Sequence, residues 1–110
     1  MIVVDQIPVI LGDPGTSVVL LSGSVAQELP LSVTHKGGLS SGDRAKTVVI
    51  YVETAQIRFA FGADPNPSTP FGYPVSSGSW IILTKRSEIN IFNHIRESLT
   101  DANLTVTGYF

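Results

Sequence analysis

The sequence contains no cysteine among its 110 residues, which excludes a disulfide framework and thiolate chemistry. The fold therefore does not depend on an oxidising compartment. Charge is also scarce, because Asp, Glu, Lys and Arg make up only 15% of the residues while hydrophobic residues make up 43%. A typical soluble domain is roughly 25% charged, and charged residues are depleted where subunits pack closely. This composition indicates a component of a protein assembly.

Basic residues are few and scattered: there are seven Lys and Arg against nine Asp and Glu, for a net charge of −2. Nucleic-acid binding asks for a basic stripe that neutralises phosphates, and the sequence has none. The first basic residue is Lys36, and no apolar run approaches the ~18 residues of a membrane span. We therefore expect synthesis in the cytosol without a secretion signal, and no contact with nucleic acid or membrane.

Short apolar runs with alternating, β-branched residues dominate the chain, whereas helical periodicity is rare. The runs predict eight strands: Ile7–Leu11, Ser17–Leu21, Leu31–His35, Lys46–Glu53, Gln56–Phe61, Trp80–Thr84, Glu88–Ile95 and Asn103–Phe110. Turn-forming residues separate them. Residues 1–110 are thus expected to form a single all-β domain, an antiparallel β-sandwich or jelly roll. The first two strands are expected to pair as a hairpin around Gly12–Gly15, and whether residues 1–30 join the core or form an arm is left open.

Residues 62–79 interrupt this pattern with four prolines and three glycines, so most of the segment is predicted to be a long loop. Loops of this length usually serve a function or become ordered on a partner. Phe71 and Tyr73 lie within it, and aromatic side chains on a proline-stiffened loop suit protein contacts. The alternative is that they fold back as a lid over the sandwich. The residues predicted to contact a partner are Asp64, Pro65, Pro67, Pro70, Phe71 and Tyr73, together with Ile2 and Val3 of an N-terminal segment that could add a strand to a neighbour.

Arg58 lies in an alternating strand, on the face opposite Ile57 and Phe59, and this predicts a solvated or interface-facing side chain. A ligand-binding arginine is the alternative. Trp80 begins an apolar run and is expected to anchor the core.

Motifs for catalysis are absent or incomplete. Gly37 and Gly42 have the spacing of a phosphate-binding loop, but Asp43 and Arg44 follow where that loop requires Lys and then Ser or Thr. His35 and His94 are the only histidines, and we expect both at the surface or on edge strands, with no metal site. There is no G-x-S-x-G motif, although a dispersed Ser-His-Asp triad remains an alternative. The sequence predicts a protein with no catalytic residue, cofactor or metal.

The second half of the chain carries a recurring pattern of core residues and turns. Its members are Ala55, Ile57, Arg58, Phe59, Gly62, Pro65, Gly78, Ile81, Leu83, Ile89, Phe92, Ile95, Leu104, Val106, Thr107 and Tyr109. Residues 46–110 thereby resemble small virion structural proteins of tailed bacteriophages, whereas residues 1–45 do not match the pattern.

The resemblance implies a non-enzymatic β-sandwich located in the virion after assembly in the host cytoplasm. It implies a capsid decoration (cement) protein that contacts the major capsid protein or other virion proteins and is a homo-oligomer, for example a trimer. A neck or tail accessory protein is an alternative. So is a receptor- or carbohydrate-binding module in which Phe71, Tyr73 and Trp80 provide stacking surfaces.

Overall fold

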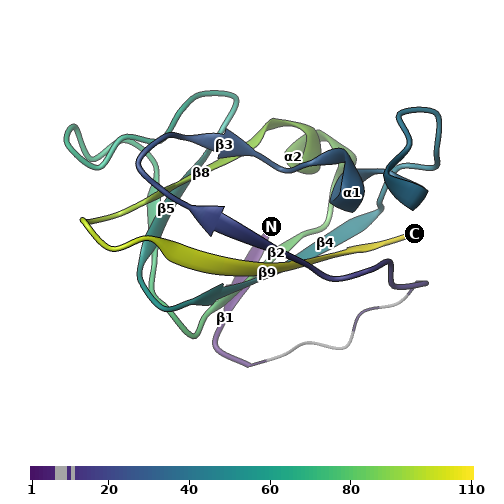
Figure 1. The fold of residues 1–110 in the computed structure, drawn as a ribbon, viewed down its shortest axis with the longest axis horizontal. Coiled ribbons are helices and arrows are strands. Elements are labelled where there is room, and N and C mark those ends of the chain that lie inside the picture. Colours follow the sequence, from purple (N-terminus) through teal and green to yellow (C-terminus); the bar gives the residue numbers. More distant parts are fainter. Residues whose placement is uncertain (7–9, 11) are drawn as a thin grey trace.

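Two antiparallel β-sheets face each other in the computed structural model, which describes residues 1–6, 10 and 12–110 (Figure 1). The first sheet has, in spatial order, β1 (Ile2–Val4), β7 (Trp80–Leu83), β4 (Thr47–Glu53), β9 (Ala102–Tyr109) and β2 (Val18–Ser22). The second has β3 (Gln27–Glu28), β8 (Phe92–Arg96), β5 (Ile57–Phe61) and β6 (Tyr73–Val75). Short helical segments connect them: α1 (Leu31–Thr34), the 3₁₀ turn η1 (Lys36–Gly38) and α2 (Arg86–Ile91).

The strand pairing is that of a jelly roll. Strand β2 pairs with β9, β3 with β8, β4 with β7 and β5 with β6, so the chain forms nested antiparallel pairs like one long hairpin rolled up. The pairings of β4 with β9 and of β5 with β8 join these four strand pairs into the two sheets. Strand β1 is added outside β7. The predicted all-β jelly-roll sandwich is therefore confirmed.

Alternation of side chains builds the core between the sheets. In β9 every second residue from Ala102 to Gly108 is buried, and Leu104 and Val106 meet residues of β4 and β5 in one hydrophobic cluster. The ring of Phe59 in β5 stacks on Phe92 in β8 with 5.4 Å between centroids. The inward-facing apolar side chains of both sheets therefore form one core.

Four predicted strands, Lys46–Glu53, Gln56–Phe61, Trp80–Thr84 and Asn103–Phe110, agree with β4, β5, β7 and β9 to within one residue at each end. Ser17–Leu21 is shifted by one residue in β2. Strand β2 pairs with β9, and Asp13 and Gly15 bond to Phe110 and Gly108 at the end of β9. The predicted Ile7–Leu11 strand lies outside the described residues except for Ile10, which is in no strand.

Two predicted strands are wrong in part or in whole. Leu31–His35 is helical at α1, because Pro30 opens a turn in which its carbonyl accepts the N–H groups of Val33 and Thr34. Glu88–Ile95 begins as α2, where the Glu88 carboxylate accepts the Thr84 N–H at 3.3 Å, and is extended only from Phe92. Runs of four or five apolar residues are too short for their period to separate a helical turn from a strand.

Candidate partner-binding surface

The long loop is anchored to the second sheet by Arg58. Residues 62–72, called the contact loop below, lie against the outer face of this sheet, and they leave Arg58 only 7% exposed. Its Nε and Nη2 donate to the two carboxylate oxygens of Glu97 at 2.7 and 2.8 Å, and its Nη1 donates to the Gly72 carbonyl at 2.9 Å. The prediction that Arg58 is solvated or faces an interface is therefore wrong, because the loop covers it.

Electrostatics keep this anchor charged. The hydrogen bonds that Arg58 donates to Glu97 raise the pKa of Arg58, burial opposes this increase, and the charge of Glu97 adds to it. A two-pronged pairing of guanidinium with carboxylate is both strong and directional. Because Glu97 and Gly72 engage three of its nitrogens, Arg58 acts as an internal clamp between β5, the residue after β8 and the contact loop.

Gly72 allows the loop to approach β5 closely. Its φ of +104° is unfavourable for other residues, and a Cβ there would lie 2.5 Å from the Phe59 carbonyl oxygen and 3.3 Å from Cγ of Arg58. Further along, Asn66 and Phe71 exchange two backbone hydrogen bonds of 2.9 Å that close the loop's tip. The loop is therefore fixed by its own contacts, before any partner binds.

The predicted contact residues of the loop divide into exposed and buried groups. Phe71 and Tyr73 are 49% and 62% exposed, so they do not form the lid that the sequence also allowed. Asp64 and Pro70 are exposed and Pro67 is half-buried. Pro65 is buried beneath the loop and not at its surface, and the predicted contact there stays a prediction. The segment is also shorter than predicted, because Tyr73–Val75 forms β6, with Pro74 on the edge strand where a missing N–H is tolerated.

Strand β1 carries the other predicted contacts. Ile2 and Val3 pair with Ile82 and Ile81 of β7 and remain exposed on the edge of the sheet. The N-terminal amine lies 3.1 Å from a carboxylate oxygen of Glu88 in α2, which fixes the start of the strand. This strand therefore extends the chain's own sheet, and among the described strands it pairs with β7 alone, which leaves its other edge open.

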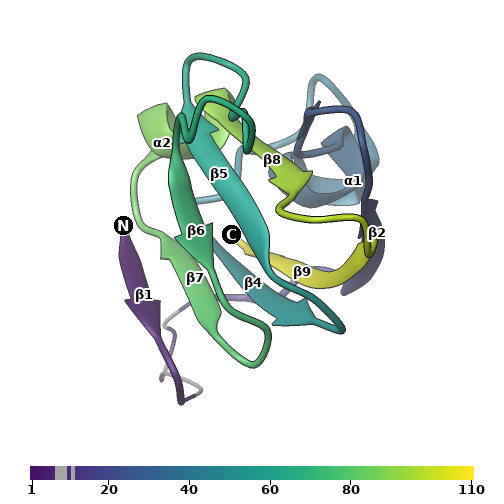
Figure 2. The ribbon, with the colours of Figure 1, turned by 90° about the vertical axis from the view of Figure 1, so that its left-hand side faces the viewer.

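These residues gather on one side of the sandwich. Strands β1 and β6 are the edge strands of the two sheets on the side of the sandwich where the chain passes directly from β6 to β7 (Figure 2). We call this the β1/β6 side. The large exposed hydrophobic side chains on it are Met1, Ile2, Val3, Phe71, Tyr73 and, at the end of α2, Ile91. Ala60, Phe61, Phe71, Gly72 and Tyr73 also line a hollow of about 340 Å³ there.

Trp80 is not part of this group. It is half-buried on the outer face of the first sheet, where its ring lies 4.4 Å from that of Tyr51. The prediction that Trp80 anchors the core is therefore wrong, since its neighbours Ile81 and Leu83 point inward instead. Trp80 belongs to the first sheet, whereas Tyr73 lies in β6 of the second sheet and Phe71 shortly before it.

The histidines do not form a shared site. His94 is fully buried, because β8 lies between β3 and β5 and the register turns His94 inward beside Phe59. Burial lowers its pKa to about 4. Its Nδ1 lies 2.9 Å from the hydroxyl of Ser22, also fully buried, and its Nε2 has no hydrogen-bond partner among the described residues. The prediction of a surface or edge position is wrong for His94, and the enclosed Ser22–His94 pair offers no access to a substrate.

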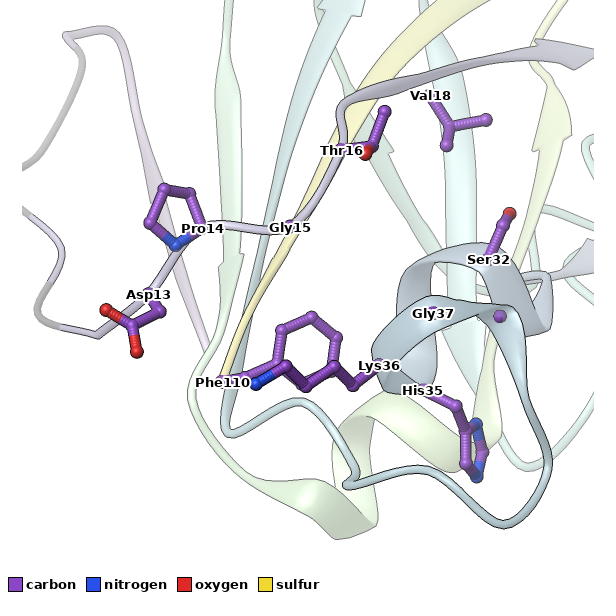
Figure 3. A pocket seen from close by; sticks show the side chains of 11 residues that line it. Asp13, Pro14, Gly15, Thr16, Val18, Ser32, His35, Lys36, Gly37 and Phe110 are labelled. Atoms are coloured by element: carbon purple, nitrogen blue, oxygen red, sulfur yellow. The ribbon is translucent and has the colours of Figure 1, made fainter.

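A second hollow, of about 400 Å³, lies between the segment around Gly15 and the α1–η1 turn (Figure 3). The Phe110 ring lies in it, and a Cβ on Gly15 would lie 3.0 Å from that ring. Asp13, His35 and Lys36 are at its rim. Nδ1 of the half-buried His35 lies 2.8 Å from the Thr34 hydroxyl. Within the described ranges, no group of three His, Asp or Glu side chains could hold a metal ion.

The roles of three residues that shape these sites were not predicted from the sequence: Glu97, Ser22 and Gly72. Glu97 and Ser22 have partners 39 and 72 residues away in the chain. The pairing of β5 with β8 brings Glu97 to Arg58, and the packing of the two sheets brings Ser22 to His94. Gly72 has a local signal, since a glycine between Phe71 and Tyr73 indicates close approach of backbones.

Comparisons of the chain with protein-family models, with curated proteins and with solved structures found no match. Among residues 1–6, 10 and 12–110, the helices are too short to cross a membrane.

Proposed function

We propose that this chain is a non-enzymatic structural protein of a bacteriophage virion, a capsid decoration (cement) protein that docks on the major capsid protein through its β1/β6 side. The observation that carries the proposal is the gathering of six large exposed hydrophobic side chains on this one side, held by strands and an anchored loop. The choice of a capsid protein as the partner is based on the resemblance of residues 46–110 to phage virion proteins. The jelly roll is compatible with it, since this architecture recurs in viral capsid proteins.

The geometry suits docking without chemistry. Tyr73 and Phe71 are exposed, yet their backbones are fixed by β6 and by the Asn66–Phe71 bridge, so little conformational entropy is lost when a partner covers them. Aromatic side chains of this kind often contribute most of the binding energy of an interface. The free edge of β1 can accept a strand from the shell through backbone hydrogen bonds.

Cosedimentation with capsids that lack the protein tests this proposal. We expect the purified chain to bind until it reaches a fixed ratio to the shell protein, and to raise the temperature at which the shell disassembles. Binding to isolated tails but not to heads would favour the neck or tail alternative. A chain that binds neither particle would contradict the proposal of a virion protein.

A second candidate, a carbohydrate-binding module, is favoured by one observation. Phe61, Phe71 and Tyr73 line the hollow on the β1/β6 side, and sugar rings stack on exposed aromatic faces. Jelly rolls also occur among lectins. A glycan array with wild-type protein and Tyr73→Ala separates the two functions: a sugar signal that is lost in the variant supports the module, and the absence of any signal removes it.

A further inference from the structure

The four edge strands of the sandwich differ in how they are protected. Natural proteins keep free edges from pairing with other chains by making them short or by placing charges or proline on them. Strand β6 has Pro74, and β3 is two residues long and includes Glu28. Strand β1 has three residues and is followed by Asp5. Strand β2 has five residues, Val-Val-Leu-Leu-Ser, with neither charge nor proline.

Strand β2 also has more apolar residues than any other of these edges, four against the three of β1. Val19 and Leu21 point to the outer face and are 67% and 55% exposed, while Val18 and Leu20 are half-buried at the rim of the core. Its strand partner in the described part of the chain is β9 alone. The surrounding sequence has no charged residue from Pro14 to Gln27. An edge of this kind is expected to aggregate unless something pairs with it.

We propose that β2 is a self-association edge, on which a second copy of this chain adds its own β2 in antiparallel orientation about a twofold axis at Leu20. The two five-stranded sheets then join into one ten-stranded sheet. Register supports this axis. A twofold at Leu20 pairs all five residues and sets Val19 opposite Leu21 of the second copy, so that both outer-face residues stay on the same face. A shift by one residue would pair outer-face with core-face positions.

Charge favours a second copy over an unrelated partner. Across a twofold axis each residue meets the same surface of the other chain, so any charge near the axis would face a like charge. The β2 edge has none. The charged side chains that line the hollow beside it, Arg96 and Asp101, already pair with each other at 2.6 Å. An apolar, self-complementary strand is therefore suited to its own copy.

This inference develops the homo-oligomer that the resemblance implies, and it leaves the proposed docking on the capsid untouched. Strand β2 lies at the far end of the first sheet from β1. A dimer formed through β2 therefore keeps the β1/β6 side of both copies free. It also replaces the trimer expected from the resemblance with a twofold dimer.

Light scattering after size exclusion tests the edge with matched variants. We expect wild-type protein to be a dimer, and Leu21→Lys to be a monomer with a dissociation constant raised on the order of 100-fold, since two leucine contacts are lost and like charges are introduced. Tyr73→Lys adds the same charge on the opposite side and is expected to stay dimeric. A wild-type monomer or trimer, or a dimer that Leu21→Lys leaves intact, would overturn the proposal.

Cysteine pairing tests the register independently of stability. The chain has no cysteine, so an introduced one is the sole thiol. Directly opposite Cα atoms in an antiparallel pair lie about 4.5–5.5 Å apart, within disulfide range. Val19→Cys mixed with Leu21→Cys is expected to give a mixed disulfide in preference to either homodimer. Equal crosslinking in all three combinations would overturn the Leu20 axis. Capsid binding that fails while dimerisation persists would contradict the docking proposal alone.

Discussion

Both carboxylate oxygens of Glu97 accept hydrogen bonds from the Arg58 guanidinium, which joins the outer face of the second sheet to the loop that covers it. The same guanidinium holds the Gly72 carbonyl at 2.9 Å. One side chain thus fixes the path of the contact loop and the position from which Phe71 and Tyr73 project. Loss of the guanidinium is expected to act on the stability of the chain and on the order of the loop together.

Replacement of Arg58 by lysine is expected to lower the free energy of unfolding by about 2 kcal/mol, since a single ammonium cannot replace the two-pronged pairing and the bond to Gly72 at once. Urea denaturation measures this change, and hydrogen exchange is expected to rise in residues 62–72. The matched control is Arg86→Lys, at an exposed position of α2. Equal unfolding midpoints for the two variants would contradict the role of Arg58 as a clamp.

Gly72 provides a second test of the loop's close approach. Gly72 and Gly78 both have positive φ, +104° and +87°, but a Cβ on Gly78 would meet nothing within 4 Å. Gly78→Ala is therefore expected to destabilise the fold by about 1 kcal/mol through backbone strain alone. Gly72→Ala is expected to add a further ~1–3 kcal/mol from the clash with the Phe59 carbonyl. Thermal unfolding compares them, and similar losses would show that the loop does not pack so tightly.

The buried His94 predicts a specific dependence of stability on pH. Its pKa is lowered from 6.5 to about 4 in the folded chain, so between these values the unfolded chain binds a proton that the folded chain does not. The contribution of His94 to the free energy of unfolding is therefore complete above about pH 6.5. It falls as the pH drops toward 4, by about 3 kcal/mol in total. Denaturation at a series of pH values measures this slope. The Ser22→Ala/His94→Leu double variant should lack this contribution, and an unchanged slope would contradict it.

The same pair predicts non-additive substitutions. Ser22→Ala or His94→Leu alone leaves the partner as a buried polar group without its hydrogen bond, at about 1–3 kcal/mol each. The double variant removes both groups and is expected to lose clearly less than the sum of the two single losses. A double-mutant cycle in urea gives this difference, and strict additivity would indicate that the hydrogen bond contributes nothing.

Alternation within long runs made much of the fold predictable. The alternation of Val48, Ile50 and Val52 indicates a strand that turns these residues to the core, and the same holds for Leu104 and Val106 in β9. The pattern of β8 also puts Phe92 and His94 on one face, a signal that the histidine is buried. The α1 segment was not predictable, because its few apolar residues fit a turn as well as a strand.

Tertiary placement limited the prediction of the site. Alternation correctly puts Arg58 on the outer face of its strand, opposite Phe59. That the contact loop covers this face depends on Glu97 and Gly72, which the sequence alone does not bring together. The exposed aromatic residues were predictable as a class, since Phe71 and Tyr73 lie among prolines and glycines that keep them out of a core.

Docking of the β1/β6 side on the capsid is the central claim, and a pair of matched variants tests it most directly. Tyr73→Asp changes an exposed side chain on this side, and Leu39→Asp makes the same change at an equally exposed residue beyond η1, 62% exposed in both cases. In quantitative cosedimentation with capsids that lack the protein, Tyr73→Asp is expected to bind about 30-fold more weakly, the loss typical of an interface hot spot, and Leu39→Asp to bind like wild type. Equal binding by both variants would contradict the claim.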